Sequence, residues 1–203
     1  MNHGSQLIDR FPLVSDQVNR DQLSVILREF ETVLQRGVEG AIVEFGCYIG
    51  TTSLFLRRLL DTRTEERPLH VYDSFAGLPP KTDEDASRAG EQFVAGELSV
   101  SKKQFLREFQ RAGLQPPIIH KGWFSDLSDA DVPERIACAF LDGDFYTSIR
   151  DSLKIVLPRM QAGGVIIIDD YAREALPGAA KAAHELLGDR PITTAYNLGI
   201  VRL

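Results

Sequence analysis

The sequence has 203 residues, of which 43% are hydrophobic and 26% charged, and its formal net charge is −6. This length and composition are typical of one globular domain with a sizeable core, so we expect a single domain over residues 1–203. An acidic chain without a run of basic residues is not expected to bind nucleic acid as its main partner. No apolar run is long enough for a membrane span and no secretory signal is present, which predicts a cytoplasmic protein with no membrane partner. Its two cysteines, Cys47 and Cys138, should therefore be buried free thiols.

The first third of the chain predicts an arm, a helix and a strand. Residues 1–19 are weakly periodic and are expected to form an N-terminal arm. An apolar stripe at helical spacing over residues 21–37 predicts an amphipathic helix that ends near Gly37. Residues 41–45 then read AIVEF, which is typical of a short buried strand.

A glycine-containing loop connects this strand to a helix that should begin near Thr51. Glu44 lies at the strand end, and Gly46 and Gly50 follow, four positions apart. Glycines at such a turn allow a tight bend and the close approach of a ligand to the backbone. The spacing is not the G-x-G-x-x-G of dinucleotide enzymes, and glycine is common at strand-to-helix turns, so this loop alone is a weak indication of a nucleotide site.

The predicted second strand, residues 69–72, ends at Asp73. An acidic side chain at this tip can accept hydrogen bonds from the diol of a ribose. A turn aspartate that caps the next segment is the alternative interpretation. The position of Asp73 after the glycine loop favours the ribose interpretation.

Residues 76–99 lose periodicity and contain several prolines and glycines, which predicts either a lid over the site or a solvated insertion. A capping box at Ser101 opens the next helix, which should end at Gly113. A third strand is expected over residues 117–120. Trp123 and Phe124 follow it, and these rings could stack on an adenine or simply fill the core.

Two apolar runs, residues 136–141 and 165–168, each end in a pair of carboxylates. The residues between them have helical periodicity, and Pro158 with the pair Gly163-Gly164 should end that helix and turn the chain. Strand–helix–strand units are parallel and right-handed, so both strands should place their carboxylates at one edge of the sheet. The four aspartates, which would repel one another unless a cation or a shared proton offsets their charge, are Asp142, Asp144, Asp169 and Asp170.

A helix is expected from Pro177 through Leu187, and two final strands within residues 191–203 around Asn197-Leu198-Gly199. The predicted fold class is therefore α/β: a Rossmann-like sheet of seven strands, mostly parallel with a C-terminal antiparallel hairpin, and with helices on both faces. This is the arrangement of class I methyltransferases.

Several motifs together resemble the macrocin O-methyltransferase family: VEFGCYIGTTS, VYDSFAGLPP, LDGDFYTSIRDSL, GGVIIIDDY and LPGAAKAA. The resemblance implies a methyltransferase of natural-product biosynthesis that uses S-adenosylmethionine and a divalent metal. The acceptor would be a hydroxyl of a small molecule such as a sugar or a glycoside, and the protein could form a homodimer. A lysine base that catechol-type enzymes use would fall at Phe145, so that mechanism is not expected.

The resemblance also implies residue roles. Asp142, Asp169 and Asp170 would hold the metal, and their hard carboxylate oxygens suit Mg²⁺ rather than zinc. Asp144 would be the general base. The residues expected to bind S-adenosylmethionine are Glu44, Gly46, Tyr48, Gly50, Thr51, Asp73, Ser74, Gly122, Trp123, Phe124 and Asp142. The alternatives are a non-catalytic S-adenosylmethionine-binding protein and, disfavoured by the glycine spacing, a nicotinamide-dependent oxidoreductase.

Overall fold

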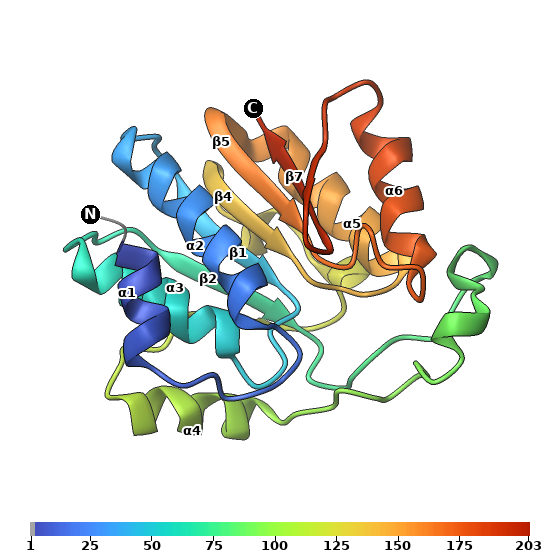
Figure 1. The fold of residues 1–203 in the computed structure, drawn as a ribbon, viewed down its shortest axis with the longest axis horizontal. Helices are drawn as coiled ribbons and strands as arrows, with labels where there is room; N and C mark the ends of the chain where they lie inside the picture. The colour runs from blue at the N-terminus through green and yellow to red at the C-terminus, as the bar shows by residue number, and fades with distance from the viewer. Residues whose placement is uncertain (1–2) are drawn as a thin grey trace.

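A seven-stranded sheet runs through the middle of the computed structural model, which describes residues 3–203 (Figure 1). The strand order is β3-β2-β1-β4-β5-β7-β6. The first five strands in the chain pair in parallel, whereas β7 is antiparallel to both of its neighbours. This confirms the predicted fold class. The strands are β1 (Ala41–Phe45), β2 (Leu69–Asp73), β3 (Ile118–Lys121), β4 (Ile136–Leu141), β5 (Met160–Ile168), β6 (Thr193–Ala195) and β7 (Leu198–Arg202).

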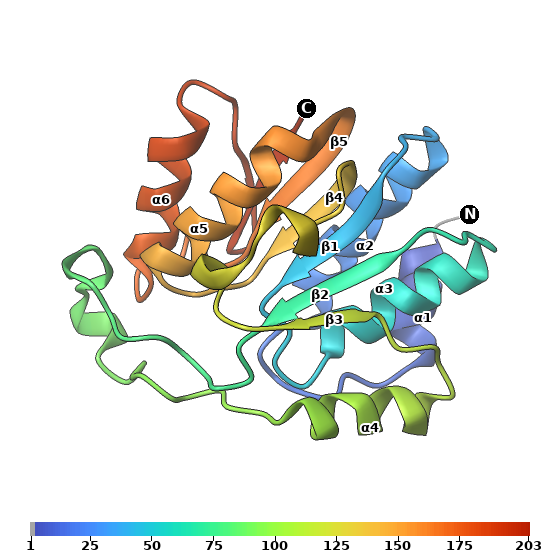
Figure 2. The ribbon, with the colours of Figure 1, turned by 180° about the vertical axis from the view of Figure 1, so that it is seen from behind.

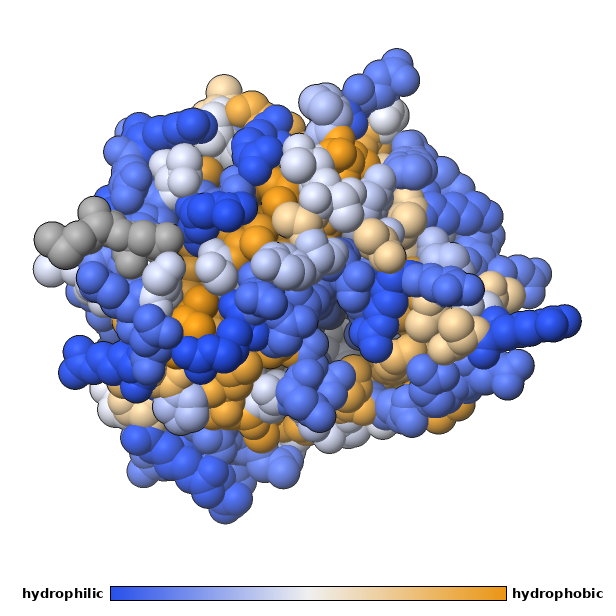
Figure 3. Space-filling view, in the orientation of Figure 1, coloured by the Kyte–Doolittle hydropathy of each residue, from blue (hydrophilic) through white to orange (hydrophobic). Residues whose placement is uncertain are grey.

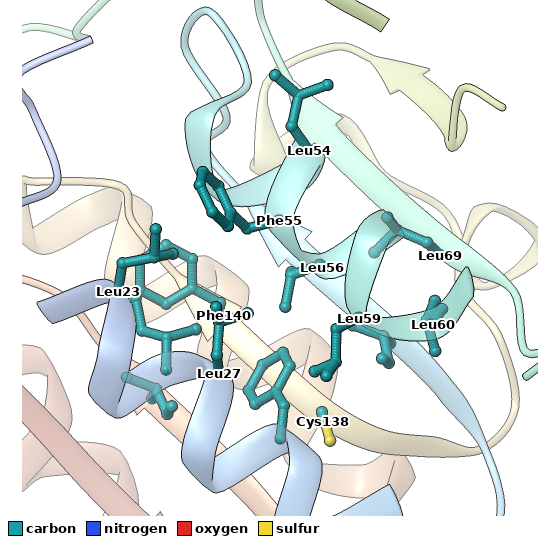
Figure 4. Close-up of a cluster of buried hydrophobic side chains, with 14 of the residues drawn as sticks. Leu23, Leu27, Leu54, Phe55, Leu56, Leu59, Leu60, Leu69, Cys138 and Phe140 are labelled. Carbon is teal, nitrogen blue, oxygen red and sulfur yellow. The ribbon is translucent and has the colours of Figure 1, made fainter. Parts of the chain in front are cut away.

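Helices cover both faces of this sheet (Figures 1 and 2). Each face has its own apolar core, one built with α2, α3 and α4 and the other with α5 and α6. Figure 4 shows how Leu23 and Leu27 of α2 gather with Phe140 of β4 and with leucines of α3. The helices are α1 (His3–Arg10), α2 (Arg20–Gln35), α3 (Thr51–Thr62), α4 (Lys102–Ala112), α5 (Tyr146–Val156) and α6 (Pro177–Leu187).

Most element boundaries agree with the sequence, but the pair Gly163-Gly164 does not end a helix and turn the chain. These glycines lie inside β5, which begins at Met160. The register of β5 against β4 shifts between Ile136 and Cys138, so the glycines sit in an irregular part of a strand. The hairpin turn also lies earlier than expected, at Tyr196 and Asn197, because β7 already begins at Leu198.

The N-terminal residues 3–10, expected as part of an arm, form helix α1. Leu7 and Ile8 are buried, and the helix packs against α2 and α3. His3 also contacts the buried Glu31 through its ring, with 2.6 Å between His3 Nδ1 and Glu31 Oε1. This segment is therefore part of the packed domain. None of the helices within residues 3–203 is both long and apolar enough to cross a membrane.

The insertion between β2 and α4, predicted over residues 76–99, extends beside α5 and α6 (green in Figure 1). Its Leu78 is buried against Phe145 and Leu176. Asp85, fully buried, accepts a hydrogen bond of 2.7 Å from the backbone N–H of Tyr146, the first residue of α5. The insertion therefore caps the helix that begins directly behind the acidic strand tip of β4.

Candidate functional site

A cavity of about 520 Å³ opens where the carboxyl ends of β1, β2, β4 and β5 meet the insertion. The molecular surface is hollowed near the middle of the face shown in Figure 3. Ligands bind at this edge in open α/β sheets because the strand-to-helix loops leave a crevice there. The cavity is lined by Gln17, Gly46, Tyr48, Asp73, Ser74, Gly77, Leu78, Pro79, Pro80, Leu98, Trp123, Phe124, Ser125, Asp142, Gly143, Asp144, Thr147, Ser148, Arg150, Asp151, Asp169, Asp170 and Arg173.

Close backbone packing fixes the conformation of the glycine loop. Gly46 has φ +86°, and a Cβ atom there would collide with the carbonyl oxygen of Asp142. Gly50 has φ +100°, and a Cβ atom would come 2.8 Å from the ring of Phe105. Only glycine fits both requirements, a left-handed backbone and no side chain. The loop after β1 is thereby pressed against the loop after β4, which brings the two halves of the cavity together.

We expect Gly46→Ala to destabilise the fold by about 2–5 kcal/mol, because a strained backbone conformation adds to a backbone clash. Gly113→Ala is a matched control, since Gly113 has φ +65° and open space around the Cβ position. The control should cost only about 1–2 kcal/mol. Urea denaturation of the two variants measures both values, and equal losses would contradict the role of the Asp142 contact.

Asp73 lies at the tip of β2 and is anchored to the glycine loop. Its Oδ2 accepts hydrogen bonds from the backbone N–H groups of Cys47 (2.8 Å) and Tyr48 (3.2 Å), and its Oδ1 accepts one from Phe75 (2.7 Å). The side chain also lines the cavity. A carboxylate has about four lone-pair sites, and three are used here, so Asp73 can still accept a hydrogen bond from one hydroxyl of a ligand diol.

Glu44, by contrast, lies behind the loop and does not line the cavity. It is buried and accepts a hydrogen bond from the hydroxyl of Ser53 on α3. Burial, with a smaller contribution from the charge of Asp73, raises the pKa of Glu44 to about 8. Through this hydrogen bond, a neutral Glu44 links β1 to α3 and so stabilises the glycine loop between them. Gly50, Thr51 and Gly122 are likewise outside the cavity lining.

Two aromatic residues after β3 form one wall of the cavity. Trp123 is 39% exposed, whereas Phe124 packs edge-on against Phe45 with 5.2 Å between the ring centroids. The exposed indole can stack against a flat group of a ligand, and Phe124 continues the apolar core into the cavity wall.

The four aspartates meet at one edge, as the sequence predicted. Backbone hydrogen bonds hold them there. The N–H of Asp142 donates to the carbonyl oxygen of Phe45, and the N–H of Asp169 donates to the carbonyl oxygen of Leu141, each at 2.8 Å. The side chains of Asp142 and Asp169 are close enough to interact electrostatically, and so are those of Asp144 and Asp170. Asp144 and Asp170 have positive φ angles of 59° and 54°, which are uncommon for non-glycine residues although aspartate adopts them more readily than most.

Electrostatics at this edge are unfavourable for four charged groups. Burial first, and then the neighbouring carboxylates, raise the pKa of Asp142 and Asp144 well above the usual range. The pKa of Asp169 rises to about 7 for the same reasons. Arg173 offsets part of the charge through an ion pair of 3.0 Å with Asp170.

The donor set at this edge fits a hard divalent cation. It consists of carboxylate oxygens only, and a cation would relieve the repulsion that raises their pKa values. Among residues 3–203, however, no three His, Cys, Asp or Glu side chains are already arranged as a set that could hold a metal ion. Binding a cation would therefore require the aspartate side chains to turn toward one common point.

Several cavity residues were not singled out from the sequence. Gln17 is one of them and comes from the segment between α1 and α2, whereas Leu78, Pro79 and Pro80 belong to the insertion for which the sequence predicted a lid or a solvated segment. Arg173 could have been recognised, because it follows Asp170 by three residues, a spacing at which side chains meet in a turn. Tyr146 and Tyr171, which flank the acidic tips, bond to Glu185 and His184 on α6 and do not line the cavity.

Residues 7–197 match the model of the family described as macrocin O-methyltransferase (TylF). The chain is 36% identical over 164 residues to 8-demethyl-8-(2,3-dimethoxy-alpha-L-rhamnosyl)-tetracenomycin-C 4'-O-methyltransferase of Streptomyces olivaceus, covering 78% of this chain and 62% of that protein. It is 34% identical to mycinamicin III 3''-O-methyltransferase of Micromonospora griseorubida, covering 76% of this chain and 63% of that protein. The chain thus spans about three fifths of the length of these curated relatives.

Solved structures share the fold. The O-methyltransferase NovP superposes with a TM-score of 0.79 at 25% identity, over 91% of this chain and 80% of that chain. A calicheamicin methyltransferase superposes with a TM-score of 0.74 at 20% identity, over 98% of this chain and 91% of that chain.

Proposed function

The chain belongs to the macrocin O-methyltransferase family, and we propose that it transfers a methyl group from S-adenosylmethionine to a hydroxyl group of a sugar or glycoside natural product. The observation that carries the proposal is that one cavity joins the glycine loop and Asp73 to the acidic edge. A methyl donor and a hydroxyl acceptor must meet in one space for transfer to occur. By their names, the relatives are O-methyltransferases of a rhamnosyl-tetracenomycin and of mycinamicin III, which supports this acceptor class.

The cofactor would lie on the side of the cavity formed by the glycine loop. There Gly46 and Tyr48 would meet it through the backbone, Asp73 and Ser74 would accept its ribose hydroxyls, and Trp123 would stack on the adenine. Phe124 would line the same wall. S-adenosylmethionine carries its reactive methyl group on a positively charged sulfur. Glu44, Gly50, Thr51 and Gly122 would act behind this surface by holding the loops in shape.

The acidic edge would activate the hydroxyl group of the acceptor. A divalent cation, which we propose to be Mg²⁺ at Asp142, Asp169 and Asp170, would contribute positive charge that lowers the pKa of a nearby hydroxyl. Asp144 would accept the proton as the hydroxyl oxygen forms its bond to the methyl carbon; the bond from that carbon to the sulfur breaks at the same time, and S-adenosylhomocysteine leaves. Arg173 keeps Asp170 paired, and Asp85 holds the start of α5 directly after Asp144. Much of the rate enhancement would come from positioning the two reactants together.

We expect Asp73→Ala to weaken S-adenosylhomocysteine binding by about 1–3 kcal/mol, the range for loss of a hydrogen-bonded charged partner. The loss has two sources, the ribose contacts and the loop N–H groups of Cys47 and Tyr48 that Asp73 now holds. Titration calorimetry measures it, with Asp189→Ala at an exposed position as the control. Unchanged affinity in Asp73→Ala would remove Asp73 from the site.

Calorimetry with the wild-type chain also tests the proposed activity against its alternatives. A nicotinamide oxidoreductase would bind NAD rather than S-adenosylhomocysteine. A non-catalytic binder would take up S-adenosylhomocysteine but would transfer no methyl group to any glycoside, polyol or phenol in a screen. A homodimer and a cytoplasmic location also stay predictions.

A further inference from the structure

Gln22 links the N-terminal helices to the acidic edge. It lies in the first turn of α2 and is only 6% exposed. Its Nε2 donates a hydrogen bond of 3.1 Å to Oδ1 of Asp169, which is 147 residues away in the sequence. A buried amide without a hydrogen-bond partner costs free energy, and Asp169 is the partner that satisfies the Gln22 side chain.

The helix cap determines which end of the Gln22 amide faces Asp169. Its Oε1 accepts a hydrogen bond of 3.1 Å from the backbone N–H of Asn19, and the Asn19 side chain accepts from the backbone N–H of Gln22 in return. This is a complete capping box. Because Oε1 is used by the cap, the amide group that points at Asp169 must be the NH₂ donor.

Asp169 is therefore held at one oxygen. Its Oδ1 receives two donors, the Gln22 amide and the backbone N–H of Asp170 at 2.9 Å. Neither of these donors uses the other oxygen, Oδ2, and the neighbouring Asp142 carboxylate supplies no donor when it is ionised. At 4% exposure there is little water to replace a lost donor. Without the Gln22 amide, Oδ1 of Asp169 would lose one of its two hydrogen bonds, and the carboxylate could rotate more freely.

We propose that Gln22 is a positioning residue, which fixes the Asp169 carboxylate so that its second oxygen is presented to the divalent cation. The inference rests on the metal part of the proposed function. Groups that hold a metal ligand through a hydrogen bond typically change metal affinity by 10–100-fold when removed. The first turn of α2 would thus tune the affinity of a site that is built at the ends of β4 and β5.

The test compares two variants of the full chain, Gln22→Met and Asn19→Ala. Methionine keeps the volume of glutamine but removes the NH₂ donor. Asn19→Ala weakens the same helix cap and leaves the Gln22 amide and its bond to Asp169 in place. Calorimetric titration with Mn²⁺ measures metal affinity directly, and thermal unfolding measures the cost of the damaged cap. The Mg²⁺ concentration for half-maximal methyl transfer and the KM for S-adenosylmethionine complete the comparison.

We expect Gln22→Met to bind Mn²⁺ about 10–100-fold more weakly and to need correspondingly more Mg²⁺, with an unchanged KM for S-adenosylmethionine. Asn19→Ala should bind Mn²⁺ like the wild type while it melts at a lower temperature. Wild-type Mn²⁺ affinity in Gln22→Met, or an equal loss in Asn19→Ala, would overturn the inference. A wild-type chain that binds no Mn²⁺ would overturn it together with the metal site. Normal Mn²⁺ binding without any methyl transfer would overturn only the proposed function.

Discussion

Replacing Asp144 by asparagine should lower kcat by about 10²–10⁴-fold, the usual effect of removing a general base, while metal and S-adenosylhomocysteine still bind. The position of Asp144 gives the reason. It follows β4 by three residues, beyond Asp142 and Gly143, and it lines the cavity. Its left-handed backbone, with φ 59°, differs from the extended strand before it and is held by packing around Gly143, where a Cβ atom would clash with Ser148.

Two opposed effects act on the Asp144 carboxylate. Burial and the neighbouring Asp170 and Asp169 raise its pKa, and the charge of Arg173 lowers it. A cation at the neighbouring aspartates would lower it further and keep the base ionised at neutral pH. Asparagine keeps the size of the side chain and removes its ability to accept a proton, so the loss should fall on kcat rather than on binding.

Single-turnover methyl transfer by Asp144→Asn measures the effect, and calorimetry with Mn²⁺ and S-adenosylhomocysteine shows whether both sites survive. Asp189→Asn makes the same chemical change at an exposed position and should leave kcat unchanged. Lost metal affinity in Asp144→Asn would make this residue a metal ligand, and near-normal kcat would make it a turn residue.

The acidic edge could be predicted from the sequence because each step of the inference is local. Apolar runs of strand length end at Leu141 and Ile168, and a helix of the right length separates them. Parallel pairing then follows from the handedness of the connection, so the carboxylates must share one edge. Asp73 follows from the same reasoning applied to β2.

Predictions from the sequence were wrong where one residue type is compatible with two local structures. Gly163 and Gly164 suggested a turn, but they occupy an irregular part of β5, where Gly164 lies close to the carbonyl oxygen of Ala137. Glycine permits both outcomes, and the choice depends on a neighbouring strand. Residues 3–10 gave too weak a pattern to predict a helix, because only a few side chains of α1 are buried.

Contacts between distant segments were beyond prediction. Nothing near Gln22 or Asp85 in the sequence indicates Asp169 or Tyr146 as a partner, since both contacts exist only once the layers have packed. Glu44 shows the same limit, because its hydrogen bond to Ser53 directs it away from the cavity although it lies one residue from the strand end.

Exhaustive chelation should abolish methyl transfer, and added Mg²⁺ should restore it. Asp142→Ala and Asp170→Ala should be inactive for the same reason, each having lost one of three proposed ligands. Asp170 is 5% exposed and paired only in part with Arg173, and Asp142 contacts Asp169 across the tips of β4 and β5. Removing either carboxylate lowers the repulsion at the edge, so these variants should fold at least as stably as the wild type without metal.

Activity is thus expected to be lost without any loss of stability, which separates a metal site from an acidic cluster of purely structural importance. Unfolding in urea with chelator present gives the stability, and Mn²⁺ calorimetry gives the affinity. S-adenosylhomocysteine binding should survive at least in Asp170→Ala, because Asp170 follows the end of β5 and lies away from the glycine loop, whereas the backbone of Asp142 packs against Gly46. Asp129→Ala, at an exposed carboxylate paired with Arg159, is the control for loss of a surface charge. Full activity after chelation would defeat the metal hypothesis, and Asp144 would then have to accept the proton beside carboxylates that share protons among themselves.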